Sequence, residues 1–259
     1  MRLVLVLGTN NEYSIVNRIA DDICQNIKMS NLSFEKIYLS KSNIEYCSGC
    51  RTCFKKGFCR YDLYDDLQTI NEKLKNADVI IFISSVYFHN VPGKLKTLID
   101  RLSYKAHLLE YSDKLGFTIV TTFSTGADIV KDYLSKFQIN LGMQNVNNFI
   151  FVEKDLNYMD FILETSECIK VGILDGFYFD QYLNTIFNVY KSEYNNETLS
   201  LYKELNYFPE NEIKYWNQNW IKRTQSFKEF RNRKIKSDYL FNEDKAFLKS
   251  LESLEVEHE

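Results

Sequence analysis

Residues 78–83 read DVIIFI, and the next five residues, 84–88, read SSVYF. The first run is apolar on both faces, which is typical of a central strand in a parallel sheet, because helices cover both faces of such a sheet. The second run changes abruptly to hydroxyl and aromatic side chains, as expected of a loop that follows a buried strand. These eleven residues therefore predict an α/β architecture.

The chain on both sides of this run alternates between strand and helix patterns. The predicted strands are residues 3–7, 34–39, 78–83, 117–123 and 146–152, and the predicted helices are residues 15–27, 63–74, 95–102, 129–137 and 161–174. Such alternation favours βαβ crossovers and a parallel sheet with helices on both faces. The fold class is therefore α/β, a flavodoxin-like doubly wound five-stranded parallel sheet of order 2-1-3-4-5 with a mainly helical C-terminal extension.

The character of the chain changes after this pattern ends. We predict a flavodoxin-like domain over residues 1–155 and a helical extension over residues 156–259, packed on the domain or on a partner subunit. Trp216 and Trp220, four residues apart, are expected to fasten a helix onto the sheet domain or across a dimer. Seven basic residues between Lys222 and Lys236 are interpreted as an exposed helix face.

Composition excludes some partners and locations. The 32 basic and 35 acidic side chains give a net charge of −3, so charge favours neither nucleic acid nor an anionic membrane surface. No apolar run approaches the length of a membrane span, and the run at residues 3–7 is too short for a secretory signal. We therefore expect a cytoplasmic protein that binds no nucleic acid and no membrane, and whose thiols stay reduced.

The carboxyl ends of the first, third and fourth strands are where a sheet of this order binds its ligand. The first of the three loops there contains Thr9, Asn11 and Ser14 directly before a helix, where hydroxyls and backbone amides suit a phosphate. It contains no Lys or Arg and lacks the glycine patterns of ATP and dinucleotide sites, so FMN fits it better. The alternative is an ordinary turn in which Ser14 caps the helix.

The second and third loops contribute aromatic and hydroxyl side chains. A flavin ring requires an apolar wall and polar groups at its edge. The candidate FMN contacts are Ser84, Ser85, Val86, Tyr87 and Phe88 in the second loop and Thr122, Phe123, Ser124 and Gly126 in the third. Packing at the rim is the alternative for the aromatic residues. We interpret His89 as a loop residue and expect no catalytic side chain, because the cofactor performs the chemistry.

Several short motifs match those of a known family. They are Ala77-Asp78, the run at residues 84–88, Gly93-Lys94-Leu95-Lys96 and Asp100-Arg101. On these residues, positions 1–155 resemble the flavodoxin-like NAD(P)H-dependent FMN reductases, and within them the iron-sulfur flavoproteins. The resemblance implies an oxidoreductase that moves electrons between NAD(P)H or a reduced electron carrier and an unknown acceptor, as a homodimer or homotetramer.

Three departures from the family pattern concern the cofactor. Asn11 stands where the family has an arginine, Val16 where it has a threonine, and Ser85 where it has a proline. We therefore expect weaker retention of FMN. Asp100 and Arg101 are interpreted as a helix-end ion pair that shapes the fold or a subunit contact, outside the active site.

Four cysteines, Cys47, Cys50, Cys53 and Cys59, lie within thirteen residues. Two consecutive Cys-x2-Cys spacings place three thiolates on one loop, which an iron-sulfur cubane accepts. Structural zinc sites usually divide their ligands into two separated pairs, so zinc is the second interpretation. A loop that binds no metal is the third.

The family resemblance implies that these four cysteines ligate a 4Fe-4S cluster near FMN, often the FMN of a neighbouring subunit. Lys55, Lys56 and Arg60 would then raise the potential of the cluster, or simply form a solvated face. The alternative function is a non-enzymatic redox- or zinc-responsive module that uses the cysteine loop. The two remaining cysteines, Cys24 and Cys168, are interpreted as packing residues.

Overall fold

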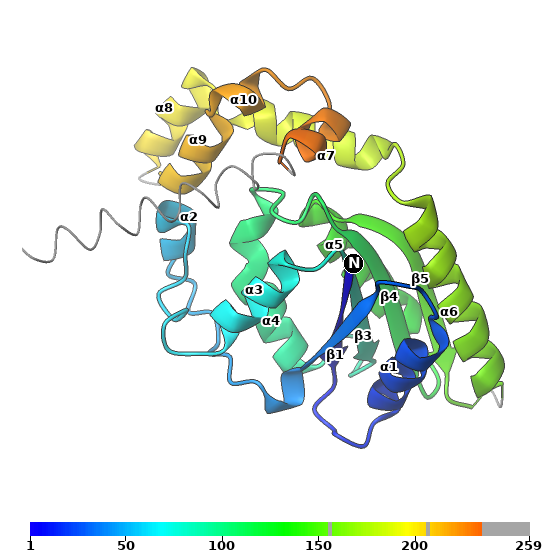
Figure 1. The fold of residues 1–259 in the computed structure, drawn as a ribbon. Coiled ribbons are helices and arrows are strands. Elements are labelled where there is room, and N and C mark those ends of the chain that lie inside the picture. Colours follow the sequence, from blue (N-terminus) through cyan, green and yellow to red (C-terminus); the bar gives the residue numbers. More distant parts are fainter. Residues whose placement is uncertain (155–156, 206–207, 235–259) are drawn as a thin grey trace, which may run out of the picture.

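A computed structural model of the chain describes residues 1–154, 157–205 and 208–234. Five parallel strands form one sheet in the order β2-β1-β3-β4-β5 (Figure 1). The strands are β1 (Arg2–Gly8), β2 (Ser33–Tyr38), β3 (Val79–Ser85), β4 (Leu115–Thr122) and β5 (Gln144–Val152). The predicted strand order is confirmed, and each predicted strand ends within two residues of the observed one.

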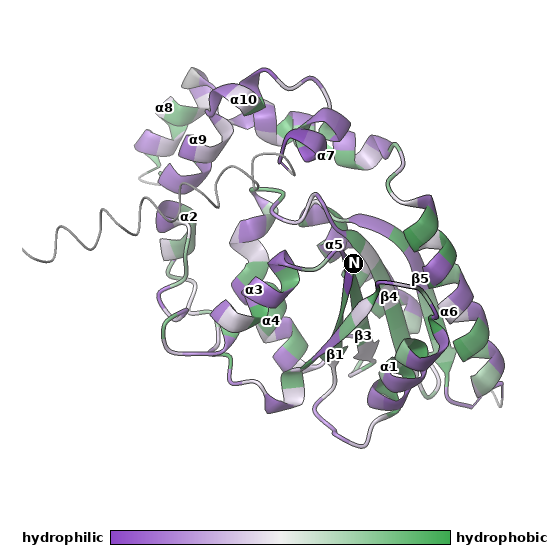
Figure 2. Ribbon diagram, in the orientation of Figure 1, coloured by the Kyte–Doolittle hydropathy of each residue, from purple (hydrophilic) through white to green (hydrophobic). Residues whose placement is uncertain are grey.

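Helices cover both faces of the sheet. On one face lie α1 (Ile15–Asn26) and α6 (Tyr158–Asp175), and on the other lie α3 (Leu67–Lys75), α4 (Gly93–Ala106) and α5 (Ala127–Asn140). Because side chains alternate along a strand, Leu3, Leu5 and Leu7 of β1 pack against α1 and α6, whereas Val4 and Val6 pack against the opposite layer. Figure 2 shows this apolar interior as hydrophobic strands between helices with mixed surfaces.

The helix predicted from residue 63 begins later, at Leu67. Asp65 Oδ1 accepts a hydrogen bond from the Leu67 amide at 3.0 Å, and Asp66 is the N-cap residue of α3. Leu63, which the apolar pattern placed in the helix, is 83% exposed. Two adjacent aspartates thus end the preceding loop and start the helix, as acidic residues commonly do at a helix N-terminus.

The extension forms a second, smaller core beyond the sheet. Its helices are α7 (Gln181–Glu193), α8 (Asn196–Glu204), α9 (Glu210–Trp216) and α10 (Asn219–Lys222), and residues 227–234 are also helical. Phe187, Trp216 and Phe230 are buried together, and Leu109 joins them from the sheet domain. In Figure 1 these helices lie beyond the edge where β1 begins, away from the carboxyl ends of the strands. The predicted helical extension is confirmed over the described residues up to 234, and the rest of the prediction, residues 235–259, lies outside them. Trp216 fastens the extension onto the sheet domain.

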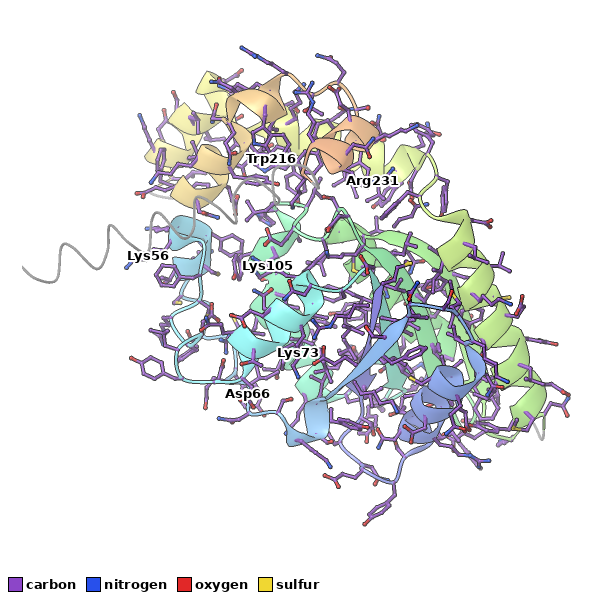
Figure 3. All side chains as sticks on the ribbon, in the orientation of Figure 1. Lys56, Asp66, Lys73, Lys105, Trp216 and Arg231 are labelled. Atoms are coloured by element: carbon purple, nitrogen blue, oxygen red, sulfur yellow. The ribbon has the colours of Figure 1, made fainter. Side chains whose placement is uncertain are left out.

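The expectation that the basic segment is an exposed helix face is wrong for two of its residues. Arg231 and Lys234 belong to the basic segment predicted to be an exposed face, yet they are only 5% and 7% exposed. The Arg231 guanidinium lies 4.1 Å from the centre of the Phe177 ring, and the Lys234 ammonium donates hydrogen bonds to two main-chain oxygens, including that of Glu110 at 2.9 Å. Figure 3 labels Arg231 within the extension. The local sequence pattern could not predict the burial of Arg231 and Lys234, because their partners Phe177 and Glu110 lie far away in the sequence. Lys236 lies outside the described residues.

The two isolated cysteines also differ from each other. Cys24, on α1, is half-buried against the core, as expected, and burial raises the pKa of its thiol to about 11. Cys168 is exposed on α6, so its interpretation as a packing residue is wrong. No helix within the described ranges combines the length and apolarity that crossing a membrane requires.

Candidate cofactor site and cysteine segment

Three loops meet at the carboxyl edge of the sheet because β1, β3 and β4 are neighbours. Gly8, at the end of β1, is paired in register with Ser84, and Ser85, at the end of β3, is paired with Thr121. Gly8 itself permits a close approach, since a Cβ there would lie 2.5 Å from a methyl group of Leu95. The loops in which the FMN contacts were predicted therefore start side by side.

The first loop is held open in front of α1 by its own polar groups. The hydroxyl of Thr9, which is 2% exposed, accepts a hydrogen bond from the Asn11 amide at 3.1 Å. The Asn11 side-chain oxygen accepts from the Tyr13 amide at 2.9 Å, and Asn17 donates to the main-chain oxygen of Asn11 at 3.3 Å. These bonds order the loop without using the side chain of Ser14, which forms no capping hydrogen bond to α1.

Three buried hydroxyls at this edge have no hydrogen-bond partner among the described residues. They are Ser14 Oγ, Ser85 Oγ and Thr121 Oγ1, one at the carboxyl end of each of the three strands or in the loop that follows it. Buried polar atoms are nearly always paired, so three orphans at one edge indicate a missing polar partner. The interpretation of Ser14 as a simple helix cap is not supported. Residues and cofactor fit here, because FMN carries phosphate and ring acceptors that hydroxyls can reach.

Thr121 was not among the predicted contacts. It occupies the penultimate position of β4 and is completely buried, so the sequence pattern marks it only as a β-branched strand residue. Its adjacency to Ser85 across the β3–β4 register is what brings it to the same edge.

The second loop turns sharply and exposes its aromatic residues. Tyr87 and Asn90 exchange two main-chain hydrogen bonds of 2.8 and 3.0 Å, and the two residues between them, Phe88 and His89, have φ values of +46° and +59°. Positive φ is costly for residues other than glycine and is found mainly where function or the surrounding structure requires it. Phe88 is fully exposed and Tyr87 is 43% exposed, as expected for a wall that a planar ligand would cover.

The third loop contacts the second through a glycine. Gly126 has φ of +86°, and a Cβ added there would lie 3.1 Å from Val86 and 3.2 Å from the His89 ring. The Thr122 hydroxyl donates to the Thr125 main-chain oxygen at 2.8 Å and accepts from the Ser124 amide at 3.3 Å, so it shapes the turn. The two loops therefore form one continuous surface.

Phe123 extends that surface toward the end of β5. Its ring is 65% exposed, and the Lys154 ammonium lies 5.0 Å from the ring centre. Lys154 also lines a cavity of about 570 Å³ together with Phe161, Asp160 and Glu164. Lys154 is a candidate ligand-binding residue that the sequence analysis did not identify. Its position two residues after the end of β5 was the signal that could have identified it.

The cysteine segment connects β2 to α3. After the short helix η1 (Leu39–Lys41) it runs through Cys47 and Cys50, which are exposed, and then through α2 (Thr52–Lys56), where Cys53 is half-buried. Cys59 is buried. Throughout the described residues, no three His, Cys, Asp or Glu side chains are arranged to hold a metal ion. The thiols are chemically suited to iron or zinc, but the segment would have to close further to bring all four onto one centre.

The thiols differ in acidity. Hydrogen bonds from Thr52, together with Ser48 and the charge of Arg60, lower the pKa of Cys50 to about 7. Burial, reinforced by the neighbouring Cys59, raises the pKa of Cys53 to about 11. Metal ligation requires thiolates, so binding at this segment would release protons.

The cysteine segment lies beside α4, and Arg101 of that helix contacts the chain at both of its ends. At its start, Cys47 lies close enough to Lys96 to contribute, after the hydrogen bond with Asp100, to raising the pKa of that lysine. At its far end, the Phe54 ring of α2 lies 5.0 Å from the ring of His107, the residue that caps the C-terminus of α4. A 14-residue helix is about 20 Å long. The ring contact places α2 at the C-terminal end of α4, and the closeness of the four cysteines to the flavin stays a prediction.

The extension packs directly on α2 (Figure 1). A Cβ added at Gly57, which ends α2 with φ of +81°, would lie 2.6 Å from the Asn211 side-chain oxygen of α9. Next to it, His107 Nδ1 lies 3.0 Å from Glu212 Oε1, and Glu212 is only 2% exposed. The cysteine segment is therefore enclosed on one side by helices that lie more than 100 residues downstream.

Asp100 and Arg101 do not form the pair that the sequence suggested. Asp100 forms an ion pair with Lys96 one turn earlier on α4. Arg101 points instead at the cysteine segment and pairs with Asp65 at 2.6 Å and Asp62 at 3.3 Å. The two side chains leave α4 in different directions because successive helical residues lie about 100° apart around the axis.

Comparison with known proteins agrees with this geometry. Residues 1–156 match the model of the family described as NADPH-dependent FMN reductase. An iron-sulfur flavoprotein of Archaeoglobus fulgidus is 32% identical over 126 residues, which cover 49% of this chain and 56% of the relative. An iron-sulfur flavoprotein of Methanosarcina thermophila is 29% identical over 101 residues, covering 39% of this chain and 52% of that protein. The chain thus matches about half the length of these curated relatives.

Solved structures share the fold at low sequence identity. The NAD(P)H:quinone oxidoreductase from Methanothermobacter marburgensis superposes with a TM-score of 0.53 at 14% identity, covering 70% of this chain and 99% of that one. An NADH:FMN oxidoreductase in its apo form gives a TM-score of 0.51 at 16% identity, covering 69% of this chain and 91% of the other. The flavodoxin-like sheet is therefore shared, and much of the extension lies outside these superpositions.

Proposed function

Because this chain belongs to the NADPH-dependent FMN reductase family, we propose that it is an FMN-dependent oxidoreductase that takes electrons from NAD(P)H or from a reduced electron carrier. The observation that carries the proposal is the set of unpartnered buried hydroxyls of Ser14, Ser85 and Thr121 at the edge where a sheet of this topology binds its ligand. In a domain that binds no ligand here, buried hydroxyls would be expected to pair within the protein.

In this proposal the three loops divide the cofactor between them. Thr9, Asn11 and Ser14, with the N-terminus of α1, hold the phosphate; α1 has no acidic residue in its first turn, and Glu12 of the same loop is paired with Lys41 at 3.6 Å. Ser84, Ser85, Val86, Tyr87 and Phe88 line one side of the ring, and Thr122, Phe123, Ser124 and Gly126 line the other. FMN, when bound, supplies the redox chemistry, while the chain positions the ring and excludes water from it.

We further propose that Cys47, Cys50, Cys53 and Cys59 hold a 4Fe-4S cluster. The names of the curated relatives and the spacing of the four thiols support this assignment. The family resemblance implies that the electron partner of such a cluster is often the flavin of a second copy. A homodimer or homotetramer would satisfy this requirement.

A redox- or zinc-responsive module is the second candidate function. One observation favours it: Cys50 is exposed, and hydrogen bonds from Thr52 lower the pKa of its thiol to about 7, so it is partly ionised and reactive at neutral pH. That function requires neither the strained aromatic turn of the second loop nor the orphan hydroxyls.

The deciding experiment is spectroscopy of the anaerobically purified protein with metal analysis of the same sample. We expect the visible absorption of a bound flavin, iron and acid-labile sulfide in equal amounts, and bleaching of the flavin on addition of NADPH or NADH. A colourless protein that cannot be loaded with FMN and that retains zinc would establish the second candidate instead.

A further inference from the structure

The side chain of Arg101 is completely buried on α4 and reaches across to both ends of the cysteine segment. We propose that Arg101, acting through Asp62 and Asp65, is the positioning residue of this segment and closes it into a loop before any metal binds. The identity of the group that the thiols hold rests on the proposed function; the closure of the loop does not.

Arg101 ties down the start of the segment through Glu45 and Asp65. Its Nη1 donates to the Glu45 main-chain oxygen at 2.7 Å and to Asp65 Oδ2 at 2.6 Å. The same Asp65 oxygen accepts the Glu45 amide at 3.0 Å, while the other Asp65 oxygen accepts the amide of Leu67, the first residue of α3. Both peptide groups of Glu45, two residues before Cys47, are therefore fixed to one ion pair.

Arg101 ties down the end of the segment through Asp62. Its Nη2 lies 3.3 Å from Asp62 Oδ1, and Asp62 Oδ2 accepts the main-chain N–H of Cys59 at 2.9 Å. Asp62 thus links the guanidinium to the main chain of Cys59, the residue with the last thiol of the segment. Because a guanidinium is planar and rigid, its two terminal nitrogens hold the two carboxylates at a fixed separation, which a lysine could not do.

We call Arg101 together with Asp62 and Asp65 the clamp, and the charges of these three side chains agree with that role. Burial alone would lower the pKa of Arg101, yet its pKa is raised, because Asp65, the Cys59 thiol and Asp62 all favour the charged form. Buried ion pairs of this kind contribute little net stability but strongly oppose any arrangement that separates them. The Nε of Arg101 is also buried and has no partner within the described residues, so the site retains one spare donor beside the segment.

The clamp explains why the four thiols differ in exposure. Cys59, which is held by Asp62, is 9% exposed, whereas Cys47 and Cys50, which lie between the two tied ends, are exposed. If the clamp opens, Cys59 should become accessible while the others change little. This outcome can be measured without metal, flavin or activity.

The test uses the full-length protein, freed of metal by a chelator under reducing conditions, and the rate at which iodoacetamide alkylates each cysteine, read by peptide mass spectrometry. Asp62→Ala should accelerate alkylation of Cys59 by about tenfold or more, since a buried charge-assisted contact is lost. Alkylation of Cys24, which lies on α1, is the internal reference. Asp66→Ala is the matched control, because Asp66 accepts the Asn43 amide at 2.7 Å and forms no contact with Arg101.

Arg101→Lys separates a clamp from a simple charge. Lysine keeps the positive charge but cannot bridge Glu45, Asp65 and Asp62 together, so Cys59 should be alkylated about as fast as in Asp62→Ala. Protection of Cys59 in this variant equal to that of the wild type would overturn the proposal, as would unchanged Cys59 alkylation in Asp62→Ala. If Arg101→Lys fails to fold, the Asp62→Ala and Asp66→Ala pair still decides.

Reconstitution with ferrous iron and sulfide tests the clamp and the 4Fe-4S cluster separately. With the clamp and the cluster both correct, Asp62→Ala binds less iron than Asp66→Ala, and the reduction potential of its remaining cluster differs from that of the wild type. Wild-type protein that takes up no iron while Cys59 alkylation still responds to Asp62→Ala would refute the cluster and leave the clamp intact. Normal iron uptake with no alkylation response would refute the clamp alone.

Discussion

The indole N–H of Trp216 donates a hydrogen bond to the main-chain oxygen of His107 at 2.7 Å, which joins the helical extension to the end of α4. Trp216 is 2% exposed and stacks on Tyr190 and Phe230, with ring centres 5.7 and 5.9 Å apart. Because the His107 ring also contacts Phe54 of α2, the same joint supports the helix that carries Cys53. Figure 3 shows Trp216 in the extension and Lys56 on the neighbouring α2.

Trp216→Ala should loosen α2 as well as the extension. Removing a buried tryptophan costs about 3–5 kcal/mol of stability, and here it also removes the hydrogen bond to His107. Hydrogen exchange should rise at the amides of α2 and of α7 to α10 while the sheet stays protected. Trp220→Ala is the control, because the Trp220 indole donates within the extension, to Gln218 at 2.7 Å; equal loss of α2 protection in both variants would contradict the special role of Trp216.

Ser14→Asp should abolish FMN binding. A carboxylate beside the phosphate introduces a repulsion of about 2–4 kcal/mol, which weakens binding by about a hundredfold. Ser14→Ala, which removes only the unpartnered hydroxyl, should weaken binding by about tenfold or less. Titration of the apoprotein with FMN, followed by quenching of flavin fluorescence, measures both, and equal affinities for the two variants would remove Ser14 from the phosphate site.

Gly126→Ala should weaken FMN binding beyond its effect on the backbone. The new Cβ meets Val86 and His89 and pushes the second and third loops apart. Gly49→Ala is the matched control, because Gly49 also has positive φ, at +67°, but nothing lies within 4 Å of its added Cβ. Both substitutions should cost about 1–2 kcal/mol of stability, and only Gly126→Ala should lower FMN affinity. A loss of affinity in both would point to a general destabilisation.

Cys50→Ala should remove iron without unfolding the sheet. Cys50 is exposed and contributes nothing to either sheet core, so the circular dichroism and FMN content should stay at wild-type values. Cys168→Ala removes an equally exposed thiol on α6 and should retain iron. Full iron content in Cys50→Ala would refute the proposed ligand set.

The contribution of Lys105 to stability should rise with pH. Burial lowers the pKa of this lysine from 10.5 to about 8, with Glu110 opposing the shift. Between these values Lys105 binds a proton in the unfolded chain but not in the native chain, so its contribution to the unfolding free energy increases over pH 8–10 by up to about 3 kcal/mol. Below pH 8 the native state bears the full cost of the buried charge.

Lys105→Met should therefore be more stable than wild type at pH 7 and should lose this rise. Lys75 still pairs with Glu110 at 2.8 Å in that variant, so the carboxylate is not abandoned. Urea unfolding at several pH values measures the effect. Lys228→Met, which removes an exposed lysine, should keep the wild-type slope, and an unchanged slope in Lys105→Met would show that Lys105 is not the responsible group.

The sequence alone predicts the five strands and their order, and it identifies the three loops of the candidate cofactor site. The apolar runs at β1 and β3 and the helical periods between strands are local patterns, and parallel strands place their carboxyl ends on one edge whatever the side chains beyond them are. That is why the loops containing Ser14, Ser85 and Gly126 could be identified as neighbours. The spacing of the four cysteines is likewise a local property and suffices to suggest a metal.

Only the tertiary structure revealed what holds these parts in place. Arg101 and Asp62 are 39 residues apart and His107 and Trp216 are 109 apart, and no periodicity connects them. The orphan hydroxyl of Thr121, the buried Arg231 and the exposed Cys168 depend in the same way on which surfaces meet after folding. The sequence by itself therefore determined the elements and the residues able to bind a cofactor, because those follow from local spacing. The closure of the cysteine segment and its placement along α4 were decided by packing between distant elements.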